Sequence, residues 1–165
     1  MGILNFSPGF LLKKNNMRLL RTDHNHPDFK VLVEALNHEL SVRDGEDHAF
    51  YSQFNEIESL GHVVLAYEGD IVVGCGAFKF FDVGMVELKR MYTSPIGRKK
   101  GTATHVLKEL EVWAKELRNI SCVLETGKNL LEAVALYSKS GYHRIPNYDP
   151  YLTTDNSICF EKTLN

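Results

Sequence analysis

Cysteine is scarce in this chain of 165 residues, and long apolar runs are missing. Its three cysteines, Cys75, Cys122 and Cys159, stand far apart, and no two share a CxxC spacing. An odd number of dispersed cysteines argues against a disulfide framework and predicts buried thiols in a reducing compartment. No apolar stretch approaches the roughly 18 residues of a membrane span. The sequence therefore predicts a cytoplasmic protein with no membrane partner.

An excess of positive charge is also missing. The chain has 19 Lys and Arg against 21 Asp and Glu, a formal net charge of -2. A chain with this balance has no global positive field to hold a polyanion, so we expect no nucleic-acid partner. Any basic binding site must be local. With 44% hydrophobic residues, the chain has enough apolar side chains for the core of one domain.

The first 16 residues, MGILNFSPGFLLKKNN, differ in pattern from the rest of the chain. Ser7-Pro8-Gly9 interrupts their apolar stretch, and no signal-peptide pattern is recognisable. A myristoylation match fails because Phe6 stands where Ser or Thr is required. We predict an N-terminal arm over residues 1–16 and a single domain over 17–165.

Hydrophobic periodicity predicts an alternation of strands and helices in the domain. Helices are expected over 27–43, less clearly over 48–57, over 102–118 and over 130–140, and strands over 17–22, 62–67, 71–78, 85–92, 121–126 and 157–161. Alternation in the fourth strand places Glu87 and Lys89 on one side, which predicts that this side faces a wet cleft. The order implies a mixed α/β fold, a sheet covered by helices.

The segment GRKKGTA, from Gly97 to Ala103, puts three positive charges just before the long helical pattern. The first N–H groups of a helix lack acceptors, and the helix dipole attracts anions to that end. Gly101 allows close approach to the backbone, and Thr102 offers a hydroxyl donor. The segment has the components of a pyrophosphate site, but a solvated basic loop has the same composition. It matches neither a Walker loop nor a dinucleotide fingerprint.

The pattern Arg98-x-x-Gly101-x-Ala103, followed by LETG at 124–127 and by Ala133-x-x-x-Tyr137-x-x-x-Gly141-Tyr142, resembles the GCN5-related N-acetyltransferase (GNAT) family. The resemblance spans about residues 17 to 162, and LKRMY with GCGA at 74–77 looks most like small stand-alone acetyltransferases. It implies a mostly antiparallel central sheet with helices on both faces, and acetyl-CoA as co-substrate.

By this resemblance, the basic loop binds the pyrophosphate of acetyl-CoA and the preceding strand end runs beside the pantetheine arm. The residues implied are Met91, Tyr92, Thr93, Arg98, Lys99, Lys100, Gly101, Thr102, Ala103 and Thr104. Many family members also have an Asn seven residues before the tyrosine; here Leu130 is at that position and Asn129 is one residue early. Asn129 is thus either a CoA contact or, with Glu132, a helix cap.

The resemblance gives Tyr137 the role of general acid toward the departing thiolate; alternatively, its ring simply fills the apolar helix face. An amine with a pKa near 10 is neutral about once in a thousand molecules at pH 7, a handicap of roughly 4 kcal/mol, so a base is needed. Glu87 is the first candidate, with Glu125 second. The alternative for Glu87 is an ion pair with Lys89 or Arg90.

The acceptor is expected to be a small-molecule amine, and the family usually builds its acceptor wall where Arg43, Asp44, Asp47, His48 and Tyr51 lie. A protein or peptide acceptor and a non-catalytic acyl-CoA-binding module stay open as alternatives. DHNHPD at 23–28 has two histidines but no third ligand at a metal-site spacing, so we expect no metal. The protein is expected to be a monomer or a homodimer.

Overall fold

The computed structural model describes residues 16–54 and 56–165. The predicted arm, residues 1–16, thus lies outside the described part except for Asn16. The helices are α1 (Pro27–Asp44), α2 (His48–Ser52), α3 (Thr102–Glu116) and α4 (Leu131–Lys139), with short 3₁₀ turns at Gly45–Asp47 and Pro95–Gly97. The strands are β1 (Met17–Thr22), β2 (His62–Glu68), β3 (Ile71–Asp82), β4 (Met85–Thr93), β5 (Ser121–Gly127), β6 (His143–Ile145) and β7 (Ser157–Thr163).

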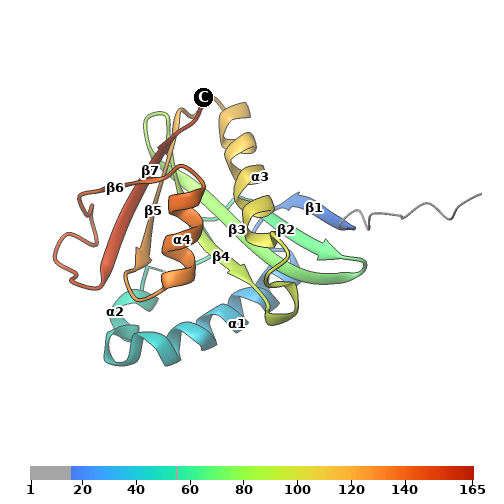
Figure 1. Ribbon diagram of the computed structural model, residues 1–165, viewed down its shortest axis with the longest axis horizontal. Helices are drawn as coiled ribbons and strands as arrows, with labels where there is room; N and C mark the ends of the chain where they lie inside the picture. Colours follow the sequence, from blue (N-terminus) through green and yellow to red (C-terminus); the bar gives the residue numbers. More distant parts are fainter. Residues whose placement is uncertain (1–15, 55) are drawn as a thin grey trace, which may run out of the picture.

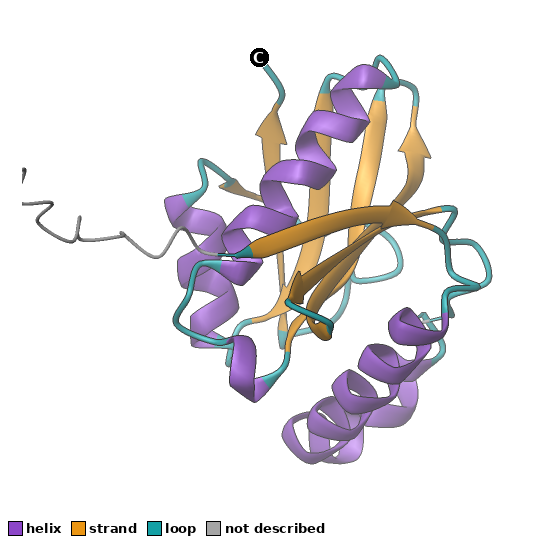
Figure 2. Cartoon of the chain, turned by 90° about the vertical axis from the view of Figure 1, so that its right-hand side faces the viewer, coloured by secondary structure: helices purple, strands orange, loops and turns teal. Residues whose placement is uncertain are grey.

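The seven strands form one sheet in the order β1-β2-β3-β4-β5-β7-β6. Neighbouring strands are antiparallel except for β4 and β5, which run parallel. Figures 1 and 2 show α3 and α4 on one side of the sheet and α1 on the other. The predicted mixed, mostly antiparallel sheet with helices on both faces is confirmed. No helix in the described ranges is long and apolar enough to cross a membrane.

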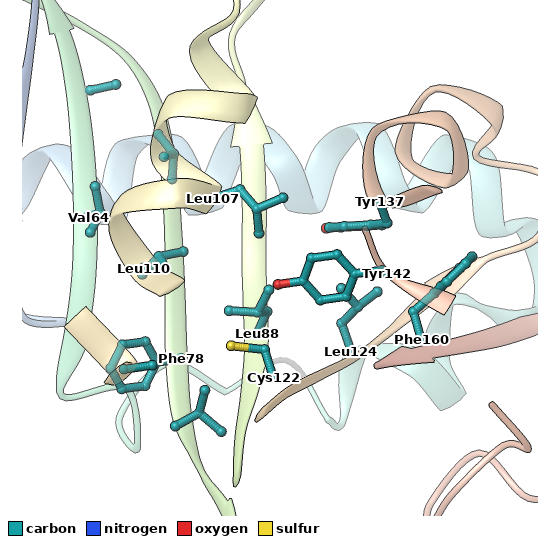
Figure 3. Packing of buried hydrophobic residues seen from close by; sticks show 14 of the residues in the cluster. Val64, Phe78, Leu88, Leu107, Leu110, Cys122, Leu124, Tyr137, Tyr142 and Phe160 are labelled. Atoms are coloured by element: carbon teal, nitrogen blue, oxygen red, sulfur yellow. The ribbon is translucent and has the colours of Figure 1, made fainter. Parts of the chain in front are cut away.

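Each face of the sheet has its own core. On one face Phe29, Leu32 and Val33 of α1 pack against buried side chains of β2 and β3. On the other face Val106, Leu107, Leu110 and Ala114 of α3 continue into a cluster with α4, β5 and β7 (Figure 3). The helical stripes in the sequence therefore identified both core faces.

Close packing of α3 on the sheet depends on Gly76. A β-carbon at this position would lie 2.8 Å from Leu110 Cδ1 and 2.9 Å from Val106 Cγ1, closer than packed carbon atoms allow. Glycine thus lets α3 lie directly on β3. This contact fixes the start of α3 relative to the end of β4, where the basic loop lies.

Two elements differ from the expectation. Instead of the helix expected over 48–57, α2 comprises only His48–Ser52, and Phe54 packs its ring 5.9 Å from that of Tyr151. The short strand β6 was not predicted, because a three-residue edge strand has too little periodicity to recognise and is held only by pairing with β7. In both cases tertiary contacts override local pattern.

Candidate active site

Strands β4 and β5 separate midway along the sheet, as Figure 1 shows. Their pairing covers only Met85–Glu87 of β4 and Ser121–Val123 of β5. From Leu88 onward, the side of β4 that faces β5 has no ladder partner in the described sheet. Because unpaired N–H and C=O groups seek partners, this edge can hydrogen-bond an extended ligand.

A bulge in β4 lies where the strands separate. Cys75 pairs with Tyr92 and Ala77 with Lys89, so two residues, Arg90 and Met91, face the single residue Gly76. Arg90 adopts a left-handed φ of 56°. A bulge of this kind redirects side chains, so Arg90 does not follow the strict alternation that the sequence pattern assumes.

Two adjoining cavities open at this place. The larger, about 540 Å³, lies between the end of β4, the start of α3 and α4. The smaller, about 200 Å³, lies between the end of α1, α2, β4 and β5. The residues that line both are Leu36, Leu40, Arg43, Met91, Leu130, Ala133 and Tyr137. A ligand in one cavity can therefore meet a ligand in the other beside Met91 and Tyr137.

Most of the residues predicted for the co-substrate line the larger cavity. They are Met91, Tyr92, Thr93, Arg98, Lys99, Thr102 and Ala103. Lys100, Gly101 and Thr104 are absent from its lining, and Asn129 lines the smaller cavity instead. The α4 helix begins at Leu131 with Leu130 as the N-cap residue, so Asn129 does not cap it.

The basic loop is shaped by Gly101 and Thr102. Gly101 has φ +78° and is the N-cap residue of α3, a left-handed conformation that favours glycine. The Thr102 hydroxyl, predicted as a ligand donor, instead donates to the Gly97 carbonyl at 2.8 Å and is buried. Thr102 thus closes the loop, and the N–H groups of the first turn of α3 remain for an anion.

Two of the loop's three cations have acidic partners. Arg98 Nη2 lies 2.7 and 3.0 Å from the two carboxylate oxygens of Glu39 on α1, and Arg98 Nε donates to the Thr93 carbonyl at 3.0 Å. Lys100 Nζ lies 3.0 Å from Glu68. The formal charge of the loop is thus partly neutralised, so the backbone contributes a larger share of any anion binding.

The smaller cavity has charged, polar and apolar side chains in its lining. Arg43, Asp44, Asp47 and Tyr51 line it, as predicted for an acceptor wall. His48 is not part of the lining; its Nδ1 lies 3.6 Å from Asp44. Several lining residues were not assigned to the site from the sequence, among them Lys89, Arg90, Tyr151 and Asn156. For Lys89, the alternation of β4 had indicated a side that faces the cleft.

Glu125 on β5 lines the smaller cavity and is largely buried. Burial raises the pKa of its carboxyl to about 7, and Ser157, which hydrogen-bonds it, and Lys89 oppose this rise. A carboxyl with this pKa both accepts and releases a proton near neutral pH. Glu125 is thus suited to act as a general base.

Replacement of Glu125 by Gln is expected to stabilise the fold at alkaline pH. The folded-state pKa, about 7, exceeds the ordinary value of 4.5, so the folded state binds the proton more tightly than the unfolded state does. Stability therefore falls as pH rises from about 4.5 to 7, and the penalty is complete above 7. Thermal unfolding should show Glu125→Gln several degrees more stable than wild type at pH 8.5, with no such gain below pH 4.5. A gain of equal size at both pH values would contradict this.

Glu87, the first candidate base, lies in a different environment. It is 3% exposed, accepts a hydrogen bond from the Tyr148 hydroxyl at 2.7 Å and lies 3.4 Å from Lys89 Nζ and 3.8 Å from Lys79 Nζ. It is not among the residues that line either cavity. The predicted wet side of β4 thus begins beyond Glu87, at Lys89, and these contacts favour the ion-pair alternative for Glu87.

Tyr137 projects from α4 to the place where the two cavities meet. It is 5% exposed, and its ring centroid lies 5.7 Å from that of Tyr142 and 6.2 Å from that of Phe160 (Figure 3). Burial, and then the negative charge of Glu125, raise the pKa of its phenol. The phenol therefore stays protonated at neutral pH and is able to donate a proton.

The histidine-rich segment before α1 serves local structure. His26 Nδ1 accepts a hydrogen bond from the Asp28 backbone N–H at 3.2 Å and caps α1, while His24 Nδ1 lies 3.3 Å from the Leu60 carbonyl oxygen. Within residues 16–54 and 56–165, no group of three or more His, Cys, Asp or Glu side chains could hold a metal ion.

Comparison with known proteins gives a consistent result. Residues 29–142 match the model of the acetyltransferase (GNAT) family. The chain is 34% identical over 101 residues to the N-acetyltransferase YsnE of Bacillus subtilis, an uncharacterised protein, with 60% of this chain and 67% of YsnE covered.

Two solved structures are similar in fold. A Klebsiella pneumoniae protein assigned as an acyl-CoA N-acyltransferase has a TM-score of 0.75 and 25% identity, with 90% of this chain and 98% of that chain covered. A GNAT family acetyltransferase from Elizabethkingia anophelis, solved with acetyl-CoA bound, has a TM-score of 0.65 and 17% identity, with 92% and 100% covered.

Proposed function

This chain belongs to the acetyltransferase (GNAT) family, and on that premise we propose that it transfers acetyl from acetyl-CoA to the primary amine of a small molecule. The observation that carries the proposal is the pair of adjoining cavities that meet at Met91 and Tyr137. One has the features of a pyrophosphate and pantetheine channel, and the other contains a carboxyl with a pKa near neutrality.

The larger cavity fits acetyl-CoA in two respects. The first turn of α3 offers unpaired N–H groups beside the left-handed Gly101, where a pyrophosphate would bind. The edge of β4 from Met91 to Thr93 has no strand partner, and apart from the Thr93 carbonyl, which accepts from Arg98 Nε, it offers backbone partners for the amide groups of a pantetheine arm. Acetyl-CoA would supply the acetyl group as a thioester.

We assign Glu125 as the general base, in preference to Glu87. Its carboxylate would take the proton of the substrate ammonium, directly or through one water, because only the neutral amine attacks. The amine nitrogen would bond to the acetyl carbon while the carbon–sulfur bond breaks. Tyr137 would donate its phenolic proton to the departing sulfur, so the two residues carry the two proton transfers.

Direct attack in a ternary complex is favoured over an acyl-enzyme. All three cysteines are 0% exposed, and burial raises the pKa of Cys75 and of Cys122 to about 12. A buried thiol with a raised pKa is a poor nucleophile because so little of it is thiolate. Steady-state kinetics with both substrates varied should therefore give intersecting, not parallel, reciprocal plots.

A small acceptor suits the smaller cavity, whose volume of about 200 Å³ is below that of drug-sized sites. A protein or peptide acceptor and a non-catalytic acyl-CoA-binding module are the alternatives. Release of thiol from acetyl-CoA across matched panels of small amines and peptides discriminates them. Turnover with peptides alone, or tight binding without any turnover, would contradict the proposal. Absence of a nucleic-acid partner, a cytoplasmic location and a monomeric or dimeric state stay predictions.

Replacement of Gly101 by Val should weaken acetyl-CoA binding more than replacement of Lys99 by Ala. A β-carbon at Gly101 has room, with His105 at 3.5 Å, so the cost arises from φ +78°, which a β-branched residue resists. The turn would shift and misalign the N–H groups, and the acetyl-CoA KM is expected to rise about tenfold. Lys99→Ala should change it less than threefold. The reverse order would indicate a solvated loop whose charges act alone.

A further inference from the structure

Three cations line the smaller cavity, and two of them have acidic partners. Arg43 pairs with Glu132 on α4. Lys89 Nζ lies 3.4 Å from Glu87 Oε1 and donates to the Tyr151 hydroxyl at 3.1 Å. For Arg90, no carboxylate of the described residues lies within ion-pair distance. Arg90 is therefore the cation of this cavity that lacks a counterion.

The Arg90 side chain is also incompletely hydrogen-bonded. It is 6% exposed, and its Nη2 donates to Asn37 Oδ1 and, at 3.4 Å, to the Val33 carbonyl of α1. Its buried Nε has no acceptor among the described residues. Burial lowers the pKa of the guanidinium, which nevertheless remains charged at neutral pH. A buried cation with a spare donor is costly unless an anion binds it.

The bulge of β4 places Arg90 in the lining of the smaller cavity, with its side chain against α1. The left-handed turn at Arg90 directs its side chain to α1, while the next residue, Met91, packs toward α3 and lines both cavities. Arg90 therefore lines the smaller cavity one residue away from the junction with the larger one. A ligand held by Arg90 would lie close to the acetyl donor.

The same cavity has negative groups from other elements. Glu125 comes from β5, and Asp44 and Asp47 come from the end of α1 and the turn after it. A cavity with an uncompensated cation from one strand and acidic groups from neighbouring elements matches a small ligand that carries both an ammonium and a carboxylate.

We propose that the acceptor is an amino-acid-like amine whose carboxylate binds the Arg90 guanidinium while its amine lies at Glu125. This inference rests on the proposed function and specifies its substrate class. Because the guanidinium fork matches a carboxylate, the acid group orients the amine toward the thioester. Amines without a carboxylate leave the Arg90 charge buried and unpaired, and they are poorer substrates.

The test compares amino acids with matched amines in the wild-type protein. A panel of amino acids with different side chains is assayed by thiol release from acetyl-CoA, each beside its carboxamide and its decarboxylated amine. The best amino acid should exceed its decarboxylated amine roughly 10- to 100-fold in kcat/KM. The carboxamide has a less basic amine and therefore more of the neutral form, so a preference for the amino acid over it reflects carboxylate recognition.

Arg90→Gln should abolish this preference, and Lys79→Gln is the control. Lys79 is a cation with a carboxylate partner, Glu87, and it lines neither cavity, so its replacement should leave the ratio of amino acid to decarboxylated amine unchanged. Arg90→Lys keeps the charge and should recover part of the ratio. If Arg90→Gln does not fold, the wild-type panel still decides.

Each outcome has a distinct meaning. Equal or better turnover of the decarboxylated amines would overturn the inference and leave acetyl transfer to small amines intact. No turnover of any small amine would contradict the proposed function instead. In that case, thermal unfolding in the presence of acetyl-CoA is measured with and without amino acids. If amino acids raise the unfolding temperature of the wild type but not of Arg90→Gln, Arg90 binds carboxylates.

Discussion

Replacement of Glu125 by Gln is expected to lower kcat by about 10²-fold or more, the usual contribution of a positioned general base. Gln cannot accept the ammonium proton, yet it has nearly the same volume, so the shape of the cavity should change little. In the wild type, kcat/KM should rise with pH through an apparent pKa of about 7 and then level off, because the base is active when deprotonated. In Glu125→Gln this rise should disappear.

Glu87→Gln is the matched control, because Glu87 is also a strand carboxyl near Lys89 but lies outside both cavities. It should lose stability with its ion pairs and the Tyr148 hydrogen bond while the pH-dependent rise near 7 persists. If Glu87→Gln abolishes the rise and Glu125→Gln does not, the assignment of the base returns to Glu87.

Replacement of Tyr137 by Phe is expected to lower kcat by about 10²-fold, with the acetyl-CoA KM changed less than threefold. Phe keeps the ring that packs against Tyr142 and Phe160, so the cavity wall remains while the proton donor is lost. Because the raised pKa keeps the phenol protonated, the wild-type rate should not fall at mildly alkaline pH on account of this residue.

Tyr142→Phe separates the loss of the acid from the loss of a core hydroxyl. Tyr142 belongs to the same aromatic cluster, but its hydroxyl donates to Glu111 at 3.1 Å and it lines neither cavity. It should unfold at a lower temperature with kcat unchanged. Equal turnover in wild type and Tyr137→Phe would assign Tyr137 to packing alone, the alternative that its helical position left open.

The candidate site was predictable where function depends on local order along the chain. The basic loop, Gly101 and the first turn of α3 are consecutive, so their pattern indicates an anion site before any contact is known. Tyr137 was identified by family resemblance, because Tyr137 lies in one helix and Gly141 lies just after the end of that helix, so their spacing is visible in the sequence. Spacing along one element does not change on folding, so these residues lie in the structure where the pattern places them, while their roles stay predictions.

The choice between two carboxyls was different. Glu87 and Glu125 lie on adjacent strands. Alternation alone predicts the face of the sheet on which each side chain lies, but not which side chains surround it. Glu125 lies beyond the point where β4 and β5 stop pairing, so it lines the cavity. Glu87 lies within the paired part and is enclosed by Tyr148, Lys79 and Lys89. The position of Arg90 in the cavity lining could not be predicted from the sequence, because a bulge breaks the alternation of side chains along β4.

The sequence by itself determined the family, the order of most elements, the two core faces and the basic loop before α3, because each is encoded in local periodicity or consecutive residues. Only the tertiary structure shows how the residues of the GRKKGTA segment differ. Arg98 and Lys100 pair with carboxylates that are distant in sequence, and Thr102 closes the loop. Burial, ion pairing and the pKa of Glu125 depend on residues remote in sequence, so only the folded arrangement of α1, β4, β5 and α4 could decide them.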